Sequence, residues 1–324
     1  MSTRRKRQGG GPPQQRQRIV LDCDPGHDDA IAILLAARHP RLKLEAITTV
    51  AGNQTVEKTS RNALRVCTLA GIRDVPIAAG MDRPLVREQV VAADIHGESG
   101  LDGPALPEPD LALAPRHAVD LLIELLLASD GDLTIVATGP LTNVATAIRR
   151  EPRIVPKIQQ IVLMGGAIGL GNVTPAAEFN IYVDPEAAHI VFNCGRPVTM
   201  IGLDVTHQAQ ATPEVRARIR ALGNPVAHLV DGLLEFFAAT YREVFNFPAP
   251  PVHDPCAVAR VIDSTLLHAR PMRVDVELRG EFTTGRTVCD AFGKTGRAPN
   301  AEVGEGLDVP RFWDLLIETL GRYG

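Results

Sequence analysis

LDCDPGHDDA, residues 21–30, is the segment on which the predicted fold depends, and it carries four carboxylates within eight consecutive positions. The apolar run Ile19–Leu21 precedes it and the apolar-periodic run Ala30–Ala37 follows it, so the acids lie where a strand passes into a helix. Strand-to-helix turns at the carboxyl edge of a parallel sheet are where open α/β proteins bind ligands. We therefore expect a ligand site at residues 22–29, called the acidic turn below.

Pro25 and Gly26 favour a tight turn that can aim Asp24 and Asp29 at one point, with Asp28 at the start of the helix. Several oxygen donors are what Ca²⁺ takes, whereas softer metals call for Cys or His at close spacing. Like charges this close also need a cation to offset their repulsion. The alternative is an exposed turn with one capping aspartate and solvated acids.

Bulk properties describe an ordinary globular protein. The chain has 324 residues, 45% hydrophobic and 22% charged, and no Pro/Gly/Ser-rich linker divides its interior. We expect a single catalytic domain over residues 19–324, preceded by a disordered basic tail over residues 1–18. The net charge of −4 does not suggest a nucleic-acid-binding protein.

Five scattered cysteines without a CxxC pair indicate free thiols in a reducing compartment and argue against a zinc site. No apolar run reaches transmembrane length, and the N-terminus lacks the apolar core of a signal peptide. We therefore expect a cytoplasmic protein with no membrane partner.

Strand and helix patterns alternate six times along the chain, which predicts a doubly wound, mostly parallel sheet of Rossmann-like α/β type. Helices should cover both faces of the sheet, with a small antiparallel addition near the C-terminus. The expected strands are Ile19–Leu21, Leu42–Val50, Val75–Ala79, Leu133–Ala137, Ile158–Met164, Val198–Leu203, Met272–Leu278 and Thr283–Val288. The expected helices begin near Ala30, Thr55, Ala118, Leu141, Pro185, Pro213, Val226, Cys256 and Pro310.

Polar side chains follow several of these strands and are candidates for one shared site. Asn53 either caps a helix or contacts a ligand, and the turn that begins at Thr138 either frees a carbonyl for a metal or is a plain turn. The loop that carries Asn172, Glu178 and Asn180 offers an array of donors and acceptors suited to sugar hydroxyls.

Histidines and one structural aspartate complete this set of candidates. His96 lies in a long irregular segment, residues 81–115, and could cover a substrate or lie at the surface. The pair His253-Asp254 precedes a helix, where its carboxylate could join the acidic turn. Asp184 is interpreted as a helix cap, because Pro185 follows it at the first helical position.

These segments together resemble the inosine-uridine preferring nucleoside hydrolases, also called nucleoside N-ribohydrolases, from about Ile19 to the C-terminal helix. The matching segments are residues 22–30, Gly52-Asn53, residues 138–143, Met164-Gly165-Gly166, Glu178-Phe179-Asn180 and His253-Asp254. The resemblance implies a Ca²⁺-dependent enzyme that hydrolyses the N-glycosidic bond of ribonucleosides to ribose and free base. It further suggests nucleoside salvage and a homodimer or homotetramer.

The resemblance also assigns roles to residues. It implies Ca²⁺ ligation by the carboxylates of Asp24, Asp29 and Asp254 and by the Thr138 carbonyl. His253 would face the base and assist its departure. The substrate-binding positions that it implies are Asp28, Asn53, His96, Met164, Asn172, Glu178, Asn180 and Tyr241. The residues that set base preference, in residues 81–115 and 226–247, are not decided by the sequence.

The chemistry of the reaction is consistent with these assignments. Cleavage of the C1′–N bond leaves oxocarbenium character on the sugar and negative charge on the base, so anionic groups belong beside the ribose and a proton source beside the base. Asp24 would take the proton of a water that the metal holds, as that water attacks C1′.

Two rival interpretations remain open at this point. A haloacid-dehalogenase-like phosphatase would use Asp22 as nucleophile and Asp24 as acid with Mg²⁺, but it leaves Asn53 and the His253-Asp254 pair without roles. A non-catalytic nucleoside binder would use the same fold without turnover. Release of phosphate or of reducing sugar separates these possibilities.

Overall fold

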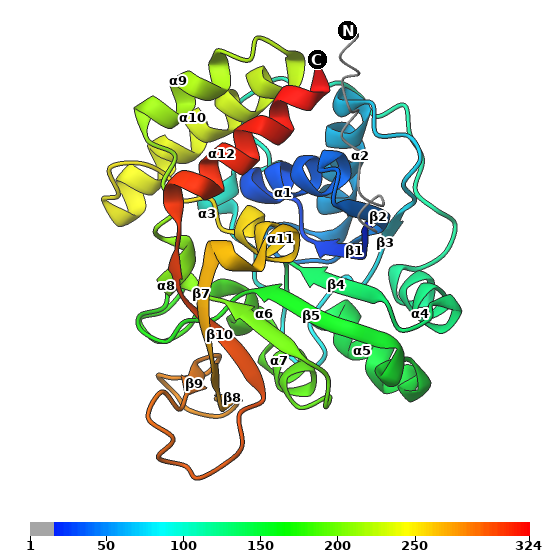
Figure 1. The fold of residues 1–324 in the computed structure, drawn as a ribbon, viewed down its shortest axis with the longest axis vertical. Helices are drawn as coiled ribbons and strands as arrows, with labels where there is room; N and C mark the ends of the chain where they lie inside the picture. Colours follow the sequence, from blue (N-terminus) through cyan, green and yellow to red (C-terminus); the bar gives the residue numbers. More distant parts are fainter. Residues whose placement is uncertain (1–15) are drawn as a thin grey trace, which may run out of the picture.

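A computed structural model describes residues 16–324, in which eight strands form one central sheet (Figure 1). Two further strands, β8 and β9, form a separate pair. The strands of both sheets are β1 (Gln17–Cys23), β2 (Leu42–Thr49), β3 (Ile77–Ala79), β4 (Leu133–Ala137), β5 (Ile158–Met164), β6 (Val198–Ile201), β7 (Leu267–Met272), β8 (Val274–Val276), β9 (Thr287–Cys289) and β10 (Ala301–Leu307). The helices are α1 (His27–Arg38), α2 (Val56–Ala70), α3 (Ala93–His96), α4 (Ala118–Ala128), α5 (Thr142–Arg150), α6 (Phe179–Val183), α7 (Pro185–Phe192), α8 (Leu203–Thr206), α9 (Pro213–Arg220), α10 (Pro225–Phe245), α11 (Asp254–Ile262) and α12 (Val309–Leu320).

The order of the strands places the acidic turn at the centre of the sheet. The order is β3-β2-β1-β4-β5-β6-β10-β7, and every neighbouring pair is parallel except β10 with β7. The direction of winding changes between β1 and β4, which makes a crevice at the carboxyl ends of these two strands. The acidic turn follows β1 directly, so it lies at this crevice, and the predicted doubly wound sheet is confirmed.

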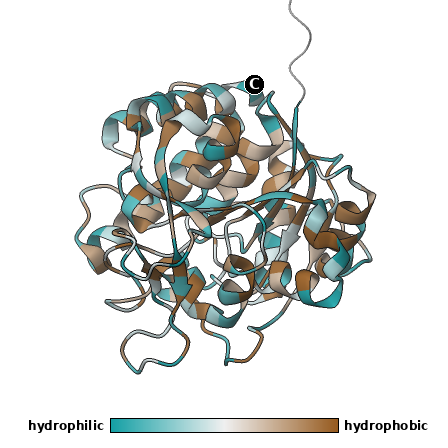
Figure 2. Ribbon diagram, turned by 60° about the horizontal axis from the view of Figure 1, so that its bottom comes forward, coloured by the Kyte–Doolittle hydropathy of each residue, from teal (hydrophilic) through white to brown (hydrophobic). Residues whose placement is uncertain are grey.

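Side chains of the sheet point alternately to two apolar cores. Along β1, Ile19 and Leu21 belong to the core that also contains α1, α2, α11 and α12, whereas Val20 belongs to the core that contains α4, α5 and α7. Helices thus cover both faces, and in Figure 2 they carry both brown and teal residues, as expected where one side faces the sheet and the other the solvent.

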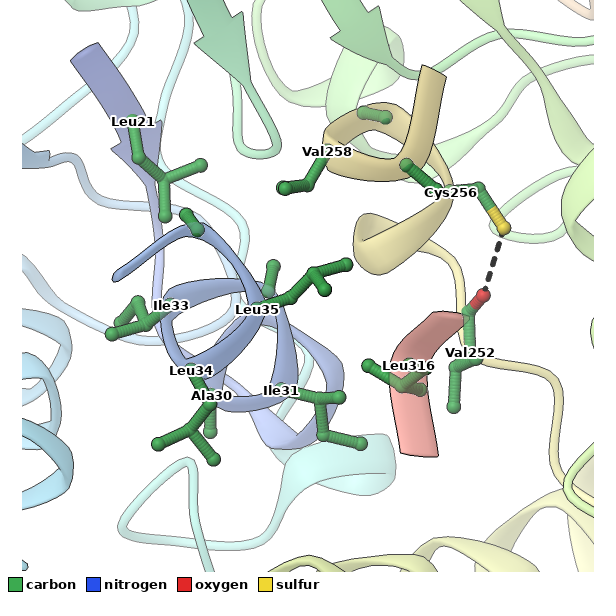
Figure 3. Packing of buried hydrophobic residues seen from close by; sticks show 14 of the residues in the cluster. Leu21, Ala30, Ile31, Ile33, Leu34, Leu35, Val252, Cys256, Val258 and Leu316 are labelled. Atoms are coloured by element: carbon green, nitrogen blue, oxygen red, sulfur yellow. Dashed lines mark hydrogen bonds between the residues drawn. The ribbon is translucent and has the colours of Figure 1, made fainter. Parts of the chain in front are cut away.

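Helix α1 is almost completely enclosed by its neighbours. Ile31, Leu34 and Leu35 are fully buried, and Val258 of α11 and Leu316 of α12 belong to the same cluster (Figure 3). Packing of α1 against α11 brings the first turns of these two helices together, although they are far apart in the sequence. The apolar core therefore fixes the distance between the acidic turn and Asp254.

Most predicted elements occur within a few residues of their expected bounds, but the C-terminal part was predicted wrongly. The expected strand over residues 272–278 is two strands, β7 and β8, and strand β10 was missed altogether. Gly304 and Gly306 interrupt the apolar alternation of β10, which hides its pattern. The predicted antiparallel addition exists twice, as β7 at the edge of the main sheet and as the separate β8–β9 pair.

The predicted domain boundary at residue 18 also differs from the structure. Strand β1 begins at Gln17, and Arg18 is tied to the domain because it forms ion pairs with Glu45 and Asp132. The rest of the predicted tail, residues 1–15, lies outside the described residues. Within residues 16–324 no helix combines the length and apolarity needed to cross a membrane. All five cysteines are free, with Cys194 and Cys289 only partly buried.

Truncation of Leu34 tests the role of the packing around α1. Leu34→Ala removes a fully buried side chain and should lower the free energy of unfolding by about 2–5 kcal/mol, measured by urea denaturation. The matched control is Leu170→Ala, at a side chain that is 79% exposed, which should change the free energy by less than about 0.5 kcal/mol. Equal effects of the two substitutions would contradict this assignment of the core.

Candidate active site

The acidic turn is held in shape by its own hydrogen bonds. Gly26 is the N-cap of α1, and its N–H donates to Asp29 Oδ2 at 3.0 Å. The Asp24 N–H donates to Asp29 Oδ1 at 3.3 Å. The turn therefore starts the helix without a capping side chain at Asp28, so the simpler interpretation of a capping aspartate with solvated acids is wrong.

Three aspartates converge at the floor of the crevice, whereas the predicted metal ligand Asp24 lies outside this group. Carboxylate oxygens of Asp28, Asp29 and Asp254 lie within 4.8 Å of one another, and all three side chains are buried. Asp24 is fully buried beside them. Its Oδ2 accepts a hydrogen bond from the Asn53 N–H at 2.7 Å, while its Oδ1 has no hydrogen-bond partner among the described residues. A buried carboxylate oxygen without a donor is suited to a cation.

Burial dominates the electrostatics of these acids. Burial raises the pKa of Asp28 to about 6, and burial together with the charge of Asp28 raises the pKa of Asp29 to about 6. Burial and neighbouring aspartates raise the pKa values of Asp24 and Asp254 well above the usual range. The cluster is therefore costly to ionise by itself, and a divalent cation would remove most of that cost.

Thr138 joins the acids to the neighbouring loop. Its hydroxyl donates to Asp29 Oδ1 at 2.9 Å, and its carbonyl accepts from Asn180 Nδ2 at 2.8 Å. A carbonyl oxygen has two lone pairs, so the Thr138 carbonyl can still ligate a metal. The predicted turn at the end of β4 is thus part of the site.

A second polar group lies on the loop between β5 and α6. Glu178 accepts hydrogen bonds from the N–H groups of Gly166, Asn180 and Ile181, which fixes its carboxylate at the start of α6. Burial nevertheless raises its pKa to about 7. Asn172 accepts from the Phe179 N–H at 2.9 Å and so closes the loop. Carboxylate and amides are brought together as the sequence predicted.

Asn53 is not a helix cap, because α2 has Thr55 at its N-cap. Its side-chain N–H groups donate to the Asp24 carbonyl at 3.2 Å and to Asp29 Oδ2 at 3.1 Å. The amide therefore ties the end of β2 to the acidic turn and lines the same pocket. Of the two possibilities left open by the sequence, only a position at the ligand site agrees with the structure.

Tyr241, His253 and Thr206 form a hydrogen-bonded chain beside the acids. The Tyr241 hydroxyl lies 2.7 Å from His253 Nε2, and the Thr206 hydroxyl lies 2.7 Å from His253 Nδ1. The backbone N–H of His253 donates to Asp28 Oδ2 at 3.0 Å, which joins this chain to the acidic turn. Burial lowers the pKa of His253 to about 4, so its imidazole is neutral near pH 7.

One pocket collects nearly all of the predicted site residues. Its lining includes every predicted substrate-binding residue, together with His253, Thr138 and Asp254. Asp24 and Asp29 do not line it, because they are fully buried beneath it. Asp184, in contrast, caps α7 through the Ala187 N–H, which confirms its structural role. Asp22 does not line the pocket, since its Oδ1 accepts from Thr48 and Asn143.

Sequence reasoning missed several residues of the site. Thr206 follows β6 at the carboxyl edge of the sheet, and only this place in the chain could have marked it as a candidate. Phe245 lines the pocket with Phe237 and Tyr241, and the spacing of four residues along α10 was the available signal. Val90 and Val91 lie in the irregular segment before α3, where no periodic pattern points to them.

Comparisons with known proteins indicate one enzyme family. Residues 19–314 match the sequence model of the inosine-uridine preferring nucleoside hydrolase family. The pyrimidine-specific ribonucleoside hydrolase RihA of Shewanella baltica (strain OS185) is 51% identical over 306 residues, which cover 94% of this chain and 96% of the relative. The protein of the same name from Citrobacter koseri is 52% identical over 306 residues, covering 94% of this chain and 98% of the relative.

Solved structures with this fold lead to the same family. A purine-preferring ribonucleoside hydrolase from Gardnerella vaginalis superposes with a TM-score of 0.89 at 35% identity, covering 94% of this chain and 98% of that chain. A plant nucleoside hydrolase, the PpNRh1 enzyme, superposes with a TM-score of 0.88 at 33% identity, covering 95% of this chain and 99% of that chain. The chain therefore belongs to the inosine-uridine preferring nucleoside hydrolases and is a ribonucleoside hydrolase, an enzyme that cleaves N-glycosyl bonds.

Proposed function

We propose that this enzyme hydrolyses pyrimidine ribonucleosides in a calcium-dependent reaction, with Asp24 as general base and His253 assisting departure of the base. The observation that carries the proposal is the cluster of Asp28, Asp29 and Asp254, with Asp24 buried beside it, at the floor of a pocket whose other polar groups suit a ribonucleoside. The preference for pyrimidines is supported by two relatives that are identical to this chain at about half of the aligned residues and are named pyrimidine-specific.

The donor set fits calcium. The residues that would hold the ion are Asp24, Asp29 and Asp254 through carboxylates and Thr138 through its carbonyl, which is an all-oxygen set of the kind that hard cations prefer. When bound, calcium would supply the positive charge that keeps these carboxylates ionised and would help to orient and polarise the attacking water. Asp24 Oδ1 and Asp22 Oδ2 both lack a hydrogen-bond partner among the described residues, and it is the contact of Asp24 with Asp29 that supports its place in this set.

Asp24 is proposed to act as the general base. The Asn53 N–H donates to Oδ2 of its carboxylate, which fixes the direction of the other oxygen, Oδ1. A carboxylate so placed can remove a proton from water as the oxygen attacks C1′ of the ribose. Asp28 and Glu178 line the pocket and would stabilise positive charge that develops on the sugar.

The leaving base needs a proton, or a strong hydrogen bond, as negative charge develops on it. Tyr241 and His253 both line the pocket and are joined to Thr206 in one chain of hydrogen bonds. A neutral imidazole that is bonded at both nitrogens can take a proton at one nitrogen as it gives one up at the other. The Tyr241 hydroxyl can therefore donate its proton to the departing base while His253 Nε2–H donates a hydrogen bond to the phenolate oxygen that is left, and a proton from solvent restores the hydroxyl after the base is released.

The direct test is an assay of reducing sugar with uridine, cytidine and inosine, each with and without a chelator. We expect turnover of uridine and cytidine to exceed that of inosine, and chelation to abolish all three activities. Added Ca²⁺ should restore activity more fully than Mg²⁺, because a site of several protein carboxylates suits the larger ion. Full activity in excess chelator would contradict the calcium requirement, and a higher rate with inosine would contradict the base preference.

Substitution of Asp24 tests the general base. Asp24→Asn should lower kcat for uridine by about 10²- to 10⁴-fold, since an amide cannot accept the proton of the water. Circular dichroism should show an unchanged fold.

The matched control is Asp22→Asn, two positions earlier in the same turn. Asp22 is equally buried but turns toward Thr48 and Asn143, so this variant should keep most of its activity. A phosphatase of the haloacid-dehalogenase type would show the opposite, with Asp22 essential and phosphate released from p-nitrophenyl phosphate. Loss of activity in Asp22→Asn alone would therefore refute the assignment of Asp24.

Leaving-group dependence tests His253. His253→Ala should lower kcat for uridine by about 10²-fold or more, because departure of the base loses its proton source. The same variant should hydrolyse p-nitrophenyl riboside with much smaller loss, since p-nitrophenolate leaves without a proton. Comparison of kcat for both substrates in wild type and variant measures the difference. Equal losses would show that His253 does not assist the leaving group.

A further inference from the structure

His27, the one residue between Gly26 and Asp28 in the acidic turn, has no part in the proposed mechanism and is completely buried. Its imidazole lies parallel to the rings of Phe236 and Phe237 of α10, with centroids 4.9 and 5.2 Å away and interplanar angles of 2° and 7°. It also stacks on His96, at 5.4 Å and 26°. His27 therefore either only fills space in the core or also fixes the position of the neighbouring His96 ring.

Both ring nitrogens of His27 have partners, and the two partners are the two ends of one loop. Nε2 lies 2.8 Å from the Asp102 carbonyl oxygen, and Nδ1 lies 3.1 Å from His96 Nδ1. The loop is closed internally, because the Asp102 carboxylate accepts from the N–H groups of Glu98 and Ser99. His27 therefore fastens the loop of residues 96–102 to the acidic turn at both of its ends.

The direction of these hydrogen bonds follows from the Asp102 carbonyl. A carbonyl oxygen only accepts, so Nε2 of His27 carries the hydrogen, and Nδ1 of the neutral ring offers a lone pair. His96 must then donate from its Nδ1. The His27 backbone N–H also lies 3.4 Å from His96 Nδ1, but this contact is at the long limit of a hydrogen bond, and the shorter ring-to-ring contact decides the assignment.

The remaining nitrogen of His96 is the one available to a ligand. His96 lines the pocket and is 6% exposed, and no described residue forms a hydrogen bond with its Nε2. Gly26 permits this close position, because a Cβ there would lie 2.5 Å from His96 Nδ1. A nucleoside in the pocket would thus meet the Nε2 lone pair of His96, a hydrogen-bond acceptor.

We propose that His27 is a positioning residue that fixes the orientation and the tautomer of His96, with the hydrogen on Nδ1 and the Nε2 lone pair toward the substrate. This inference rests on the proposed function, since it assumes that the pocket binds a nucleoside. The tautomer of His96 can nevertheless be determined without any enzymatic turnover. His27 acts only through His96 and does not touch the substrate.

Nitrogen-15 NMR of the wild-type enzyme without ligand, with the His96 signals assigned by His96→Gln, tests the tautomer. We expect a protonated Nδ1 and an unprotonated Nε2 in His96 at neutral pH. In His27→Phe, which keeps an aromatic ring against α10 but removes both hydrogen bonds, His96 should lose this preference. A wild-type His96 with its hydrogen on Nε2 would overturn the proposal, whether or not any variant folds.

A double-mutant cycle separates positioning from packing. His27→Phe should lower kcat/KM for uridine about tenfold, as expected for one lost buried hydrogen bond, but less than about twofold in a His96→Ala background. His27→Asn, whose side-chain oxygen can take the place of Nδ1, should recover most of the loss. Equal losses from His27→Phe in both backgrounds would show a purely structural role. Absence of nucleoside hydrolysis in the wild type would instead refute the proposed function and leave the NMR result to decide this inference.

Discussion

The repulsion among four buried aspartates is the constraint on which the rest of the structure depends. Asp24, Asp28, Asp29 and Asp254 are nearly or fully buried, and an uncompensated charge in such a place costs several kcal/mol. Hydrogen bonds from backbone N–H groups and from Thr138 offset part of this cost. A divalent cation would offset far more, and the same cation would give the carboxylates their role in the reaction.

The apolar core sets the geometry of the polar site. Asp28 accepts a hydrogen bond from the N–H of His253, a residue 225 positions later, because α1 and α11 pack side by side on one face of the sheet. The carboxyl ends of the parallel strands lie at the same edge of the sheet, where Thr138 follows β4 and Glu178 follows β5. The pocket therefore combines an acidic floor with a wall from α10, from α3 and from the residues just before α3.

Much of this arrangement could be predicted from the sequence, because periodic apolar runs and punctuating Gly and Pro mark the βα units. The acidic turn and the polar loops after β4 and β5 have a recognisable order of residue types, which is why their site residues could be predicted. Strand β10 was missed since its glycines interrupt the alternation. Thr206 and His27 could not be assigned roles, because their roles follow from contacts with residues 47 and 69 positions away. Such contacts leave no local pattern in a single sequence.

The central claim is that these acids together bind one calcium ion beneath the pocket. A crystal structure of the enzyme grown with calcium, with the ion identified by anomalous scattering, tests this claim most directly. We expect a single ion at the floor of the pocket, ligated by carboxylate oxygens of Asp24, Asp29 and Asp254 and by the carbonyl oxygen of Thr138. A structure in which calcium binds elsewhere, or in which these oxygens do not converge on an ion at saturating calcium, would contradict the account.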